Sequence, residues 1–274
     1  MSDLPKLFDL TGQVAIVTGG AGLLGRQFCR TLAEAGAKVV ILDIDPAAVS
    51  ELTQELNKSG FSVLGISTDI SKPESAKQLR EEVLNKFGRI DILVNSAALD
   101  PKFDPKQISE QGANAFEDYP LEAWQQALDV NLTGMFLTTQ AVVTPMLAQG
   151  KGVVINICSM YGITAPDQSL YQREGQPPQY KPVTYSTTKA GVIGFTKYLA
   201  AYYAGKNIRV NALTPGGVFN DHDAEFTQRY ASRAIMGRMA EQDEMNGALL
   251  FLASDASKYM TGANVVVDGG WTAW

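Results

Sequence analysis

Residues 13–25 read QVAIVTGGAGLLG, a short β-branched apolar run followed at once by a glycine-rich turn. An apolar run of this length is typical of a parallel strand that is buried on both faces. A helical pattern follows from Arg26 to Ala35. This order predicts a phosphate-binding turn, because glycines allow close backbone approach and a helix N-terminus presents free N–H groups. A plain strand-to-helix turn without a ligand is the alternative.

The rest of the chain alternates between strand and helix patterns without a change in composition. Strands are expected at 38–42, 62–68, 91–94, 152–157, 209–213 and 264–267, and helices at 46–58, 73–87, 121–148, 185–204 and 241–253. The alternation predicts one α/β domain over 1–274, a doubly wound (Rossmann) parallel sheet of about seven strands with helices on both faces. Three polar segments, at about 99–119, 160–184 and 218–239, interrupt it, and long loops in compact domains are usually functional or mobile.

Composition narrows the class of protein. The chain has 274 residues, of which 45% are hydrophobic and 19% charged, as in ordinary globular proteins. Its net charge of −6 and pI near 4.9 make nucleic acid an unsuitable partner, since phosphate binding needs a basic face. No apolar run is long enough to span a bilayer, and the opening MSDLPKLFDL lacks the features of a signal peptide.

The few cysteines and the single histidine argue against a disulfide framework, a metal site and a Ser-His-Asp hydrolase. Cys29 and Cys158 provide neither a disulfide framework nor a metal spacing, so we expect a reducing, cytoplasmic location and no metal site. The single histidine, His222, is not accompanied by a G-x-S-x-G motif, so a Ser-His-Asp hydrolase is not expected.

The second expected strand ends in Asp43, about 20 residues beyond the glycine turn. An acidic residue there suits the ribose hydroxyls of NAD and would repel the 2′-phosphate of NADP. A helix N-cap is the alternative role, but Asp45, before Pro46, fits that role better. Asp69, after the third strand, could contact the adenine or could cap the next turn.

Tyr185 and Lys189 stand four residues apart in YSTTK at 185–189. On a helix both would project from one face, and an ammonium near a phenol lowers the phenol pKa below about 10. A solvated helix surface is the alternative. Ligands of doubly wound sheets bind beyond the carboxyl ends of the strands. The residues at such ends are Gly19, Asp43, Asn95, Ser159 and Pro215.

Further motifs add to this pattern: TGGAGLLG at 18–25, NSAA at 95–98, Asn131 in DVNLTG, Ser159, and NALTPGG at 211–217. With these motifs the chain resembles a short-chain dehydrogenase/reductase of the ordinary single-domain type, from Gly12 to Gly270. The resemblance implies hydride transfer with a nicotinamide cofactor, here NAD. It implies that Ser159, Tyr185 and Lys189 perform the chemistry and that Asn131 supports them.

The glycine turn, Asp43 and the resemblance together imply two sets of contact residues, one for the cofactor and one for the substrate. For the cofactor they are Gly19, Gly22, Leu23, Leu24, Gly25, Asp43, Ile44, Asp69, Ile70, Asn95, Ala97, Tyr185, Lys189, Pro215, Gly217 and Val218. For the substrate they are Ser159, Tyr161, Arg173, Tyr185 and His222. The polar and aromatic side chains of 160–184 favour a sugar-derived or polyol substrate, which Arg173 or Lys181 could hold if it is anionic. The alternative for Arg173, Lys181 and His222 is a solvated surface residue, which is the more common role of lone basic side chains on loops.

Some features depart from the family pattern. The middle glycine falls at Gly22 where the ordinary subgroup has it at the position of Leu23, a spacing similar to that of epimerases and dehydratases. Asn220 replaces a threonine that commonly holds the nicotinamide amide. The longer segments 99–119 and 160–184 are similar to those of sugar-acid, polyol and activated-sugar dehydrogenases, including those linked to nonulosonate and flagellin glycosylation.

The function expected from these features is NAD-dependent interconversion of a secondary alcohol and a ketone on a polar substrate. The alternatives are a 3-oxoacyl-type ketoreductase, an epimerase or dehydratase that retains NAD, and a non-catalytic NAD-binding protein. The helix through Ala190 to Ala204 is apolar around most of its circumference, which predicts a homotetramer or homodimer. No nucleic acid or membrane partner is expected.

Overall fold

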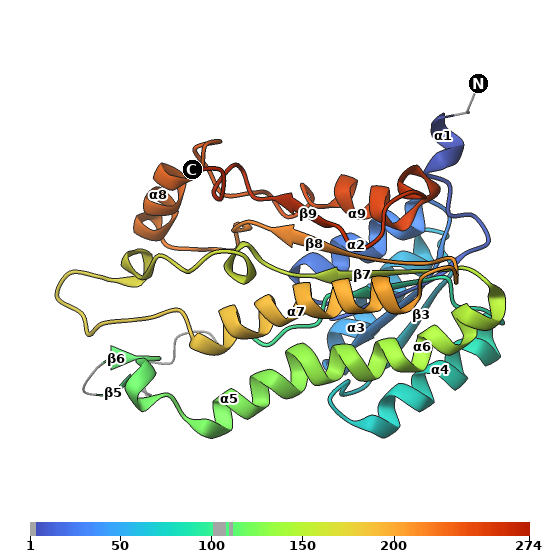
Figure 1. The fold of residues 1–274 in the computed structure, drawn as a ribbon, viewed down its shortest axis with the longest axis horizontal. Helices are drawn as coiled ribbons and strands as arrows, with labels where there is room; N and C mark the ends of the chain where they lie inside the picture. The colour runs from blue at the N-terminus through green and yellow to red at the C-terminus, as the bar shows by residue number, and fades with distance from the viewer. Residues whose placement is uncertain (1–3, 101–107, 110–111) are drawn as a thin grey trace.

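The computed structural model describes residues 4–100, 108–109 and 112–274 (Figure 1). Seven parallel strands form one sheet in the order β3-β2-β1-β4-β7-β8-β9. Its strands are β1 (Val14–Thr18), β2 (Lys38–Asp43), β3 (Val63–Ser67), β4 (Ile92–Asn95), β7 (Gly152–Ile157), β8 (Ile208–Pro215) and β9 (Asn264–Val267). The strand order reverses between β1 and β4, which confirms the doubly wound parallel sheet predicted from the sequence.

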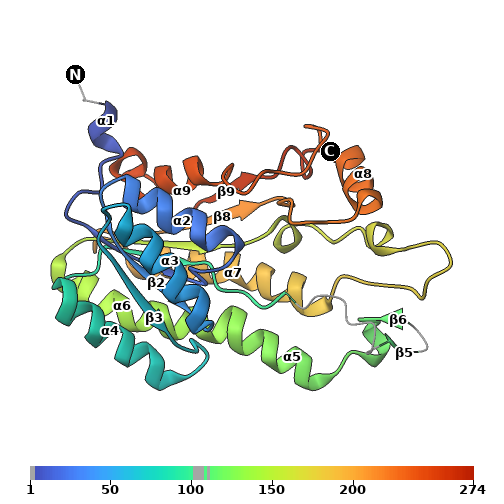
Figure 2. The same ribbon diagram turned by 180° about the vertical axis from the view of Figure 1, so that it is seen from behind.

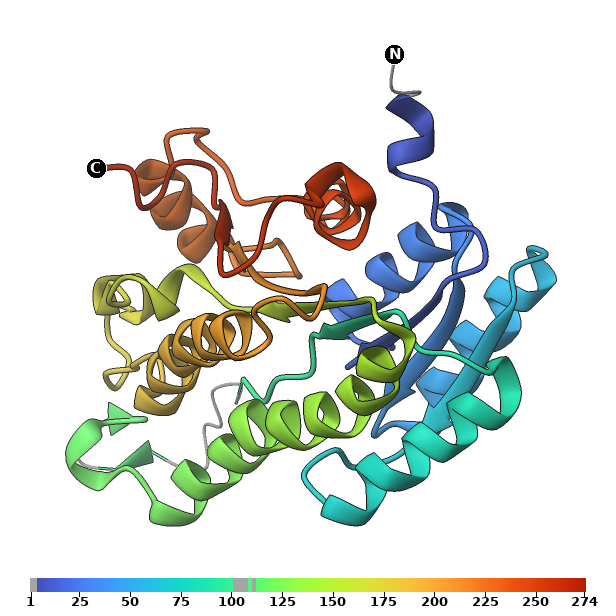
Figure 3. The same ribbon diagram turned by 45° about the vertical axis from the view of Figure 1, so that its right-hand side comes forward.

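Helices cover both faces of this sheet (Figures 2 and 3). They are α1 (Leu4–Leu7), α2 (Leu23–Glu34), α3 (Pro46–Lys58), α4 (Pro73–Phe87), α5 (Leu121–Leu128), α6 (Met135–Gln149), α7 (Val183–Tyr202), α8 (Ala224–Arg233) and α9 (Asn246–Ala253). Helices α2, α3 and α9 share one apolar cluster with the sheet, and α4, α6 and α7 share the other.

Strand β1 shows why its sequence has no polar alternation. Ala15 and Val17 pack into the cluster with α2, α3 and α9, whereas Val14 and Ile16 pack into the cluster with α4, α6 and α7. All four side chains are fully buried. A strand whose two faces are both covered needs apolar residues at every position.

Several element boundaries differ from those expected. Helix α2 begins at Leu23 rather than Arg26, and α9 begins at Asn246 rather than Glu241. The polar segment 218–239 contains a helix, α8, that the sequence pattern did not reveal. Only Phe226 and Tyr230 of this helix are buried, so its apolar face is too narrow to give a clear periodic signal.

The long helix expected over 121–148 is interrupted. A π-helical turn at Asp129–Gly134 separates α5 from α6. Such turns are frequent at functional sites because they change the direction in which a side chain points. Here the turn carries Asn131, which is almost fully buried.

The expected loop at 99–119 is only partly described, since 101–107 and 110–111 lie outside the described residues. Strands β5 (Ile108–Ser109) and β6 (Gly112–Ala113) form an antiparallel pair. Ala113 in turn pairs with Gln179. Figure 1 shows the hairpin near the long loop that precedes α7. The segments 99–119 and 160–184 therefore contact each other at the carboxyl end of the sheet.

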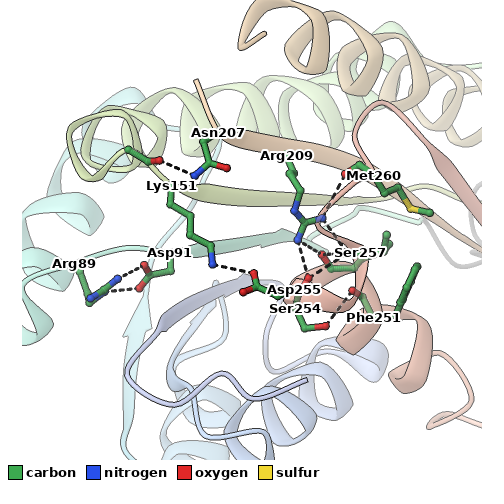
Figure 4. A network of polar contacts seen from close by, with 12 residues as sticks. Arg89, Asp91, Lys151, Asn207, Arg209, Phe251, Ser254, Asp255, Ser257 and Met260 are labelled. Carbon is green, nitrogen blue, oxygen red and sulfur yellow. Dashed lines mark hydrogen bonds and ion pairs between the residues drawn. The ribbon is translucent and has the colours of Figure 1, made fainter. Parts of the chain in front are cut away.

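A polar network ties the opposite end of the sheet together (Figure 4). The carboxylate of Asp91 accepts hydrogen bonds from the Arg89 guanidinium and from the backbone N–H of Val14. The Arg209 guanidinium donates to backbone carbonyls at the end of α9 and to the hydroxyl of Ser257. This network lies away from the strand ends where ligands of such folds bind. None of the described helices is long and apolar enough to cross a membrane.

Candidate active site

A cavity of about 1140 Å³ runs along the carboxyl ends of the strands. It extends from the glycine turn before α2 to the start of α7. The predicted contact residues on its wall are Gly19, Gly22, Leu23, Leu24, Gly25, Asp43, Ile44, Asp69, Ile70, Ala97, Ser159, Tyr161, Tyr185, Lys189, Pro215, Gly217, Val218 and His222. Three further predicted residues, Asn95, Asn131 and Arg173, lie outside this lining.

The glycine turn leaves no room for side chains. Gly19 has a φ of +63°, and a Cβ atom there would lie 2.7 Å from the Cα of Ala97. A Cβ on Gly25 would lie 1.9 Å from the carbonyl oxygen of Gly19. Gly22 is the N-cap of α2 and supplies no side-chain cap, so no side chain caps the first backbone N–H groups of the helix. The turn therefore fits a bound phosphate, whose oxygens would accept from these N–H groups.

Two aspartates at the end of β2 have different roles. Asp45 caps α3 by accepting hydrogen bonds from the backbone N–H groups of Ala47 and Ala48, as expected. Asp43 instead lines the cavity, and its carboxylate accepts from Ala21 N at 3.1 Å and from Asp45 N at 3.2 Å. Each of its oxygens keeps an acceptor site for a ribose hydroxyl.

Asp69 has the capping role considered for it, whereas its contact with the adenine stays a prediction. Its Oδ1 accepts from the backbone N–H and the hydroxyl of Ser71, which stabilises the turn before α4. Asp69 also lines the cavity. The structure thus places it beside the space expected for the adenine.

Ser159 follows β7 and is buried on the cavity wall. Its hydroxyl accepts from the backbone N–H of Tyr161, so it caps the short helical turn at Met160–Gly162. The hydroxyl proton of Ser159 stays available for another acceptor. Tyr161 packs edge-on against Tyr185, with ring centroids 6.5 Å apart, and burial raises the pKa of Tyr161 to about 12.

Tyr185 and Lys189 lie one turn apart on α7, and both side chains reach the cavity. The ammonium of Lys189 donates to the carbonyl oxygen of Ile157 at 2.9 Å and lies 5.8 Å from the Tyr185 ring centroid. The expected lowering of the phenol pKa is wrong for this structure. Burial, followed by the negative charge of Asp100, raises the pKa of Tyr185, while a hydrogen bond with Ser159 opposes the rise. Burial also lowers the pKa of Lys189.

Asn131 lies behind the cavity wall. Its side chain exchanges two hydrogen bonds with the backbone of Leu99, at 2.6 and 3.0 Å, and donates to the hydroxyl of Thr188 at 3.1 Å. The π-helical turn aims this amide at the first residues of the loop after β4. It thereby links that loop to α7, one residue before Lys189.

Two predicted contact residues are placed away from the cavity. The Asn95 amide donates to Thr139 and Asn156 in the core, because strand alternation puts Asn95 on the same face as the buried Leu93. Arg173 pairs with Asp223 and with Glu225, and it donates to backbone carbonyls of its own loop. The guanidinium therefore fastens the loop to the start of α8, which corrects the substrate role expected for it.

The lining also includes Asn220 and, from the polar segment 160–184, Tyr171, Gln179 and Tyr180. Two further lining residues, Asp100 and Asn114, were not singled out in the sequence analysis. Asp100 follows the NSAA motif by two residues, so its place just beyond a strand end was a usable signal. Asn114 lies in the polar segment 99–119, and nothing in its spacing indicates that it faces the cavity.

Comparison with known proteins assigns the family. Residues 19–272 match a family model described as "Enoyl-(Acyl carrier protein) reductase". The chain is 35% identical to the 3-oxoacyl-(acyl-carrier-protein) reductase FabG of Aquifex aeolicus (strain VF5), over 95% of this chain and 98% of that one. It is 34% identical to the D-threitol dehydrogenase of Mycolicibacterium smegmatis (strain ATCC 700084 / mc(2)155), over 97% and 95%.

Solved structures agree with this assignment. The crystal structure of a gluconate 5-dehydrogenase from Burkholderia cenocepacia J2315, in complex with NADP and tartrate, matches with a TM-score of 0.85 and 31% identity over 99% of both chains. The fold and the family model define a class of protein, the oxidoreductases that bind a pyridine nucleotide on a Rossmann sheet. The chain belongs to the short-chain dehydrogenase/reductase family, whose members are oxidoreductases.

Proposed function

We propose that the protein is an NAD(H)-dependent oxidoreductase that interconverts a secondary alcohol and a ketone on a polar, sugar-derived or polyol substrate. The observation that carries the proposal is that one cavity joins the glycine turn, Asp43 and the group formed by Ser159, Tyr185 and Lys189. A dinucleotide bound along this cavity would extend from Asp43 to the phenol of Tyr185. Its nicotinamide would supply the hydride acceptor or donor.

The choice of NAD is supported by the acidic end of β2. The 2′-phosphate of NADP would meet the carboxylate of Asp43, and the neighbouring Ile44 offers no positive charge. The related gluconate 5-dehydrogenase was crystallised with NADP. The preference of this chain for NAD or NADP therefore depends on its own residues at the end of β2, and comparing kcat/KM with the two cofactors measures it.

The proton chemistry is assigned to Tyr185. In the oxidative direction its phenolate takes the proton of the substrate hydroxyl, and in the reductive direction its phenol returns that proton to the carbonyl oxygen. Ser159 donates a hydrogen bond to the same oxygen and fixes its distance from the nicotinamide. Lys189 keeps two of its three N–H donors free of Ile157, enough to hold the nicotinamide ribose and to stabilise the phenolate. Asn131 would position a water between Lys189 and solvent.

The substrate class is supported by the polar lining beyond Ser159. Tyr161, Tyr171, Gln179, Tyr180 and Lys181 face the cavity and present hydroxyl, amide and ammonium groups. A polyhydroxylated substrate requires many such donors and acceptors, whereas a long acyl chain requires an apolar lining. The similarity to a D-threitol dehydrogenase agrees with this choice.

The test is a screen of polyols, sugar acids and activated sugars, with NAD and NADP in parallel, in which NADH or NADPH absorbance is followed. We expect reduced cofactor to form fastest with NAD and a polyol or sugar derivative. Better turnover of steroids or long aliphatic alcohols would contradict the substrate class. An epimerase or dehydratase would convert its substrate without net NADH formation, so product analysis distinguishes that alternative.

A second candidate is a 3-oxoacyl ketoreductase, favoured by the 35% identity to FabG of Aquifex aeolicus. It would use the same Ser159, Tyr185 and Lys189. Reduction of acetoacetyl-coenzyme A at a higher kcat/KM than any polyol-derived ketone would support this second candidate.

We also propose a cytoplasmic location. For assembly we propose a homodimer or homotetramer, because α7 exposes aromatic residues that would pack on a second subunit.

A further inference from the structure

An ion pair lies in the cavity next to the proposed proton donor. The Nζ atom of Lys181 lies 2.8 and 2.7 Å from the two carboxylate oxygens of Asp100. The Lys181 side chain is only 14% exposed, and that of Asp100 is 43% exposed. The two residues are 81 positions apart in sequence and come from the two loops that meet at the carboxyl end of the sheet. Both line the cavity.

The pair adjoins the position where the reacting carbon would bind. The Lys181 ammonium lies over the ring of Tyr185, 4.0 Å from its centroid. Lys181 is held there by its own backbone, whose N–H donates to Oε1 of Gln168 at 2.8 Å. A substrate whose hydroxyl reaches the Tyr185 phenol would therefore place its next carbon atoms beside the pair.

The pair is electrically balanced, and the other cations near it are already engaged. Lys189 donates to the neutral Ile157 carbonyl and is assigned to the nicotinamide ribose. Arg173 lies outside the lining and is paired with Asp223, which lines the cavity, and with Glu225. Burial, as the largest cause, lowers the pKa of His222, which disfavours a positive charge there. Within the described lining near Tyr185, a substrate carboxylate would have to displace Asp100 from Lys181 and would then lie close to the displaced carboxylate. The balance of charge favours a neutral substrate.

The hydrogen-bonding capacity that remains suits adjacent hydroxyl groups. Lys181 makes two of its three N–H bonds to Asp100, and among the described residues each carboxylate oxygen of Asp100 retains an acceptor site. We propose that the Asp100–Lys181 pair binds a neutral vicinal diol, with one hydroxyl donating to Asp100 and its neighbour accepting from Lys181. The carbons that bear these two hydroxyls are the two that follow the carbon that is oxidised, so butane-2,3-diol supplies the first hydroxyl and threitol supplies both. This inference rests on the proposed alcohol dehydrogenase function and specifies its substrate as a neutral polyol.

The experiment compares matched four-carbon substrates, with NAD and NADP in parallel. Butane-2,3-diol against butan-2-ol measures the value of a second hydroxyl, and threitol against threonate measures the cost of a carboxylate. We expect kcat/KM to be about tenfold or more higher for the diol and for threitol, the size of effect that one hydrogen bond to a charged group produces. A preference for butan-2-ol over the diol, or for threonate over threitol, overturns the inference.

Variants then test the two residues. Asp100→Asn keeps the shape and removes the charge, and Lys181→Met keeps the aliphatic stem and removes the ammonium. Each should lower the diol to mono-alcohol ratio of kcat/KM about tenfold. Lys151→Met breaks a similar pair with Asp255, 2.9 Å apart at the opposite end of the sheet, and should leave the ratio unchanged. If circular dichroism shows that Lys181→Met does not fold, the diol to mono-alcohol ratio of Asp100→Asn alone tests the inference.

The failures are distinguishable. A wild-type enzyme that oxidises butan-2-ol and the diol equally, or variants with an unaltered ratio, refute the diol site but leave the dehydrogenase proposal intact. A wild-type enzyme that turns over none of the alcohols with either cofactor, nor reduces the matching ketones, refutes the proposed function and the diol site with it.

Discussion

The ammonium of Lys189 donates a hydrogen bond to the carbonyl oxygen of Ile157, 2.9 Å away, and so joins α7 to the last residue of β7. Ser159 lies two residues beyond that carbonyl, and Tyr185 lies one helical turn before the lysine. The bond joins a strand end and a helix that come from distant parts of the sequence, and a second bond, from the Cys158 thiol to the carbonyl oxygen of Lys189, joins the same two segments. These contacts bring together the three side chains to which we assign the proton chemistry.

The first prediction concerns the proton donor. Tyr185→Phe removes the transferable proton and preserves the ring, so kcat should fall by about 10²–10⁴-fold while NAD affinity stays within about threefold. Lys189→Ala should lower both, because this residue is proposed to hold the cofactor ribose as well. Turnover by NADH absorbance and NAD affinity by calorimetry provide the measurements. Substantial turnover by the phenylalanine variant would remove Tyr185 from the mechanism.

The second prediction concerns pH. Burial first, and then the charge of Asp100, raises the pKa of the Tyr185 phenol. A raised pKa keeps the phenol protonated at neutral pH. Reduction, which needs the proton, should therefore persist at neutral pH and be lost as the pH rises through that pKa. Oxidation, which needs the phenolate, should gain rate over the same range.

Asp100→Asn provides the matched test of that prediction, because it removes one of the causes of the raised pKa. The rising limb of kcat/KM for butan-2-ol oxidation should move to lower pH, whereas Lys151→Met should not move it. A mono-alcohol is used so that lost contacts to a second hydroxyl do not enter. A limb that stays in place would show that Asp100 has no electrostatic effect on the reacting phenol.

The third prediction concerns cofactor choice. With Asp43 at the end of β2, kcat/KM should be higher with NAD than with NADP. The double substitution Asp43→Ser and Ile44→Arg removes the repulsion and supplies a cation for the 2′-phosphate, so it should move the preference toward NADP by about tenfold or more. Asp45→Ser is the matched control, since it keeps a helix cap and leaves the ribose region intact. A wild-type preference for NADP would refute the role of Asp43.

The sheet could be predicted from the sequence because the signal for it is local. Most strands of this sheet are short and mainly apolar, and the glycines of the turn mark positions where the backbone leaves no room for a Cβ atom. Helix α8 escaped prediction because only two of its residues are buried. The π-helical turn at Asp129–Gly134 escaped it because a one-residue change in helical register leaves no pattern in composition.

Side-chain partners at the site were harder to predict, because they depend on contacts between distant segments. The sequence allows Arg173 to be a substrate contact or a solvated loop residue, whereas in the structure it pairs with Asp223 and Glu225 of the polar segment 218–239. Asp100 and Lys181 meet only after the loops of β4 and β7 fold against each other. The lowered phenol pKa was wrong for a similar reason, since the degree of burial of Tyr185 cannot be derived from its spacing to Lys189.

The fourth prediction follows from the corrected place of Arg173. Its guanidinium holds Asp223, at the N-terminus of α8, and two carbonyls of the preceding loop, and its side chain is only 16% exposed. Arg173→Ala should reduce the free energy of unfolding by about 2 kcal/mol, which corresponds to a melting temperature lower by about 4–8 °C. Arg30→Ala breaks an exposed pair with Glu55 and should cost less than about 1 kcal/mol. Equal melting temperatures for both variants would contradict the fastening role.

The last prediction concerns assembly. Phe136 on α6 and Tyr198 and Tyr202 on α7 are 46%, 63% and 65% exposed, and Tyr198 stacks on Tyr202 with ring centroids 5.8 Å apart. Beside them an apolar groove runs between the π-helical turn, α6 and α7. Aromatic surface of this extent usually packs on a second protein, and a second copy of this chain is the partner we expect. We therefore predict a homodimer or homotetramer at micromolar concentration by light scattering. Tyr198→Glu places a charge in the groove and should shift the mass toward the monomer, whereas Tyr259→Glu, at a fully exposed site outside the groove, should leave it unchanged. A monomeric wild type would refute the prediction.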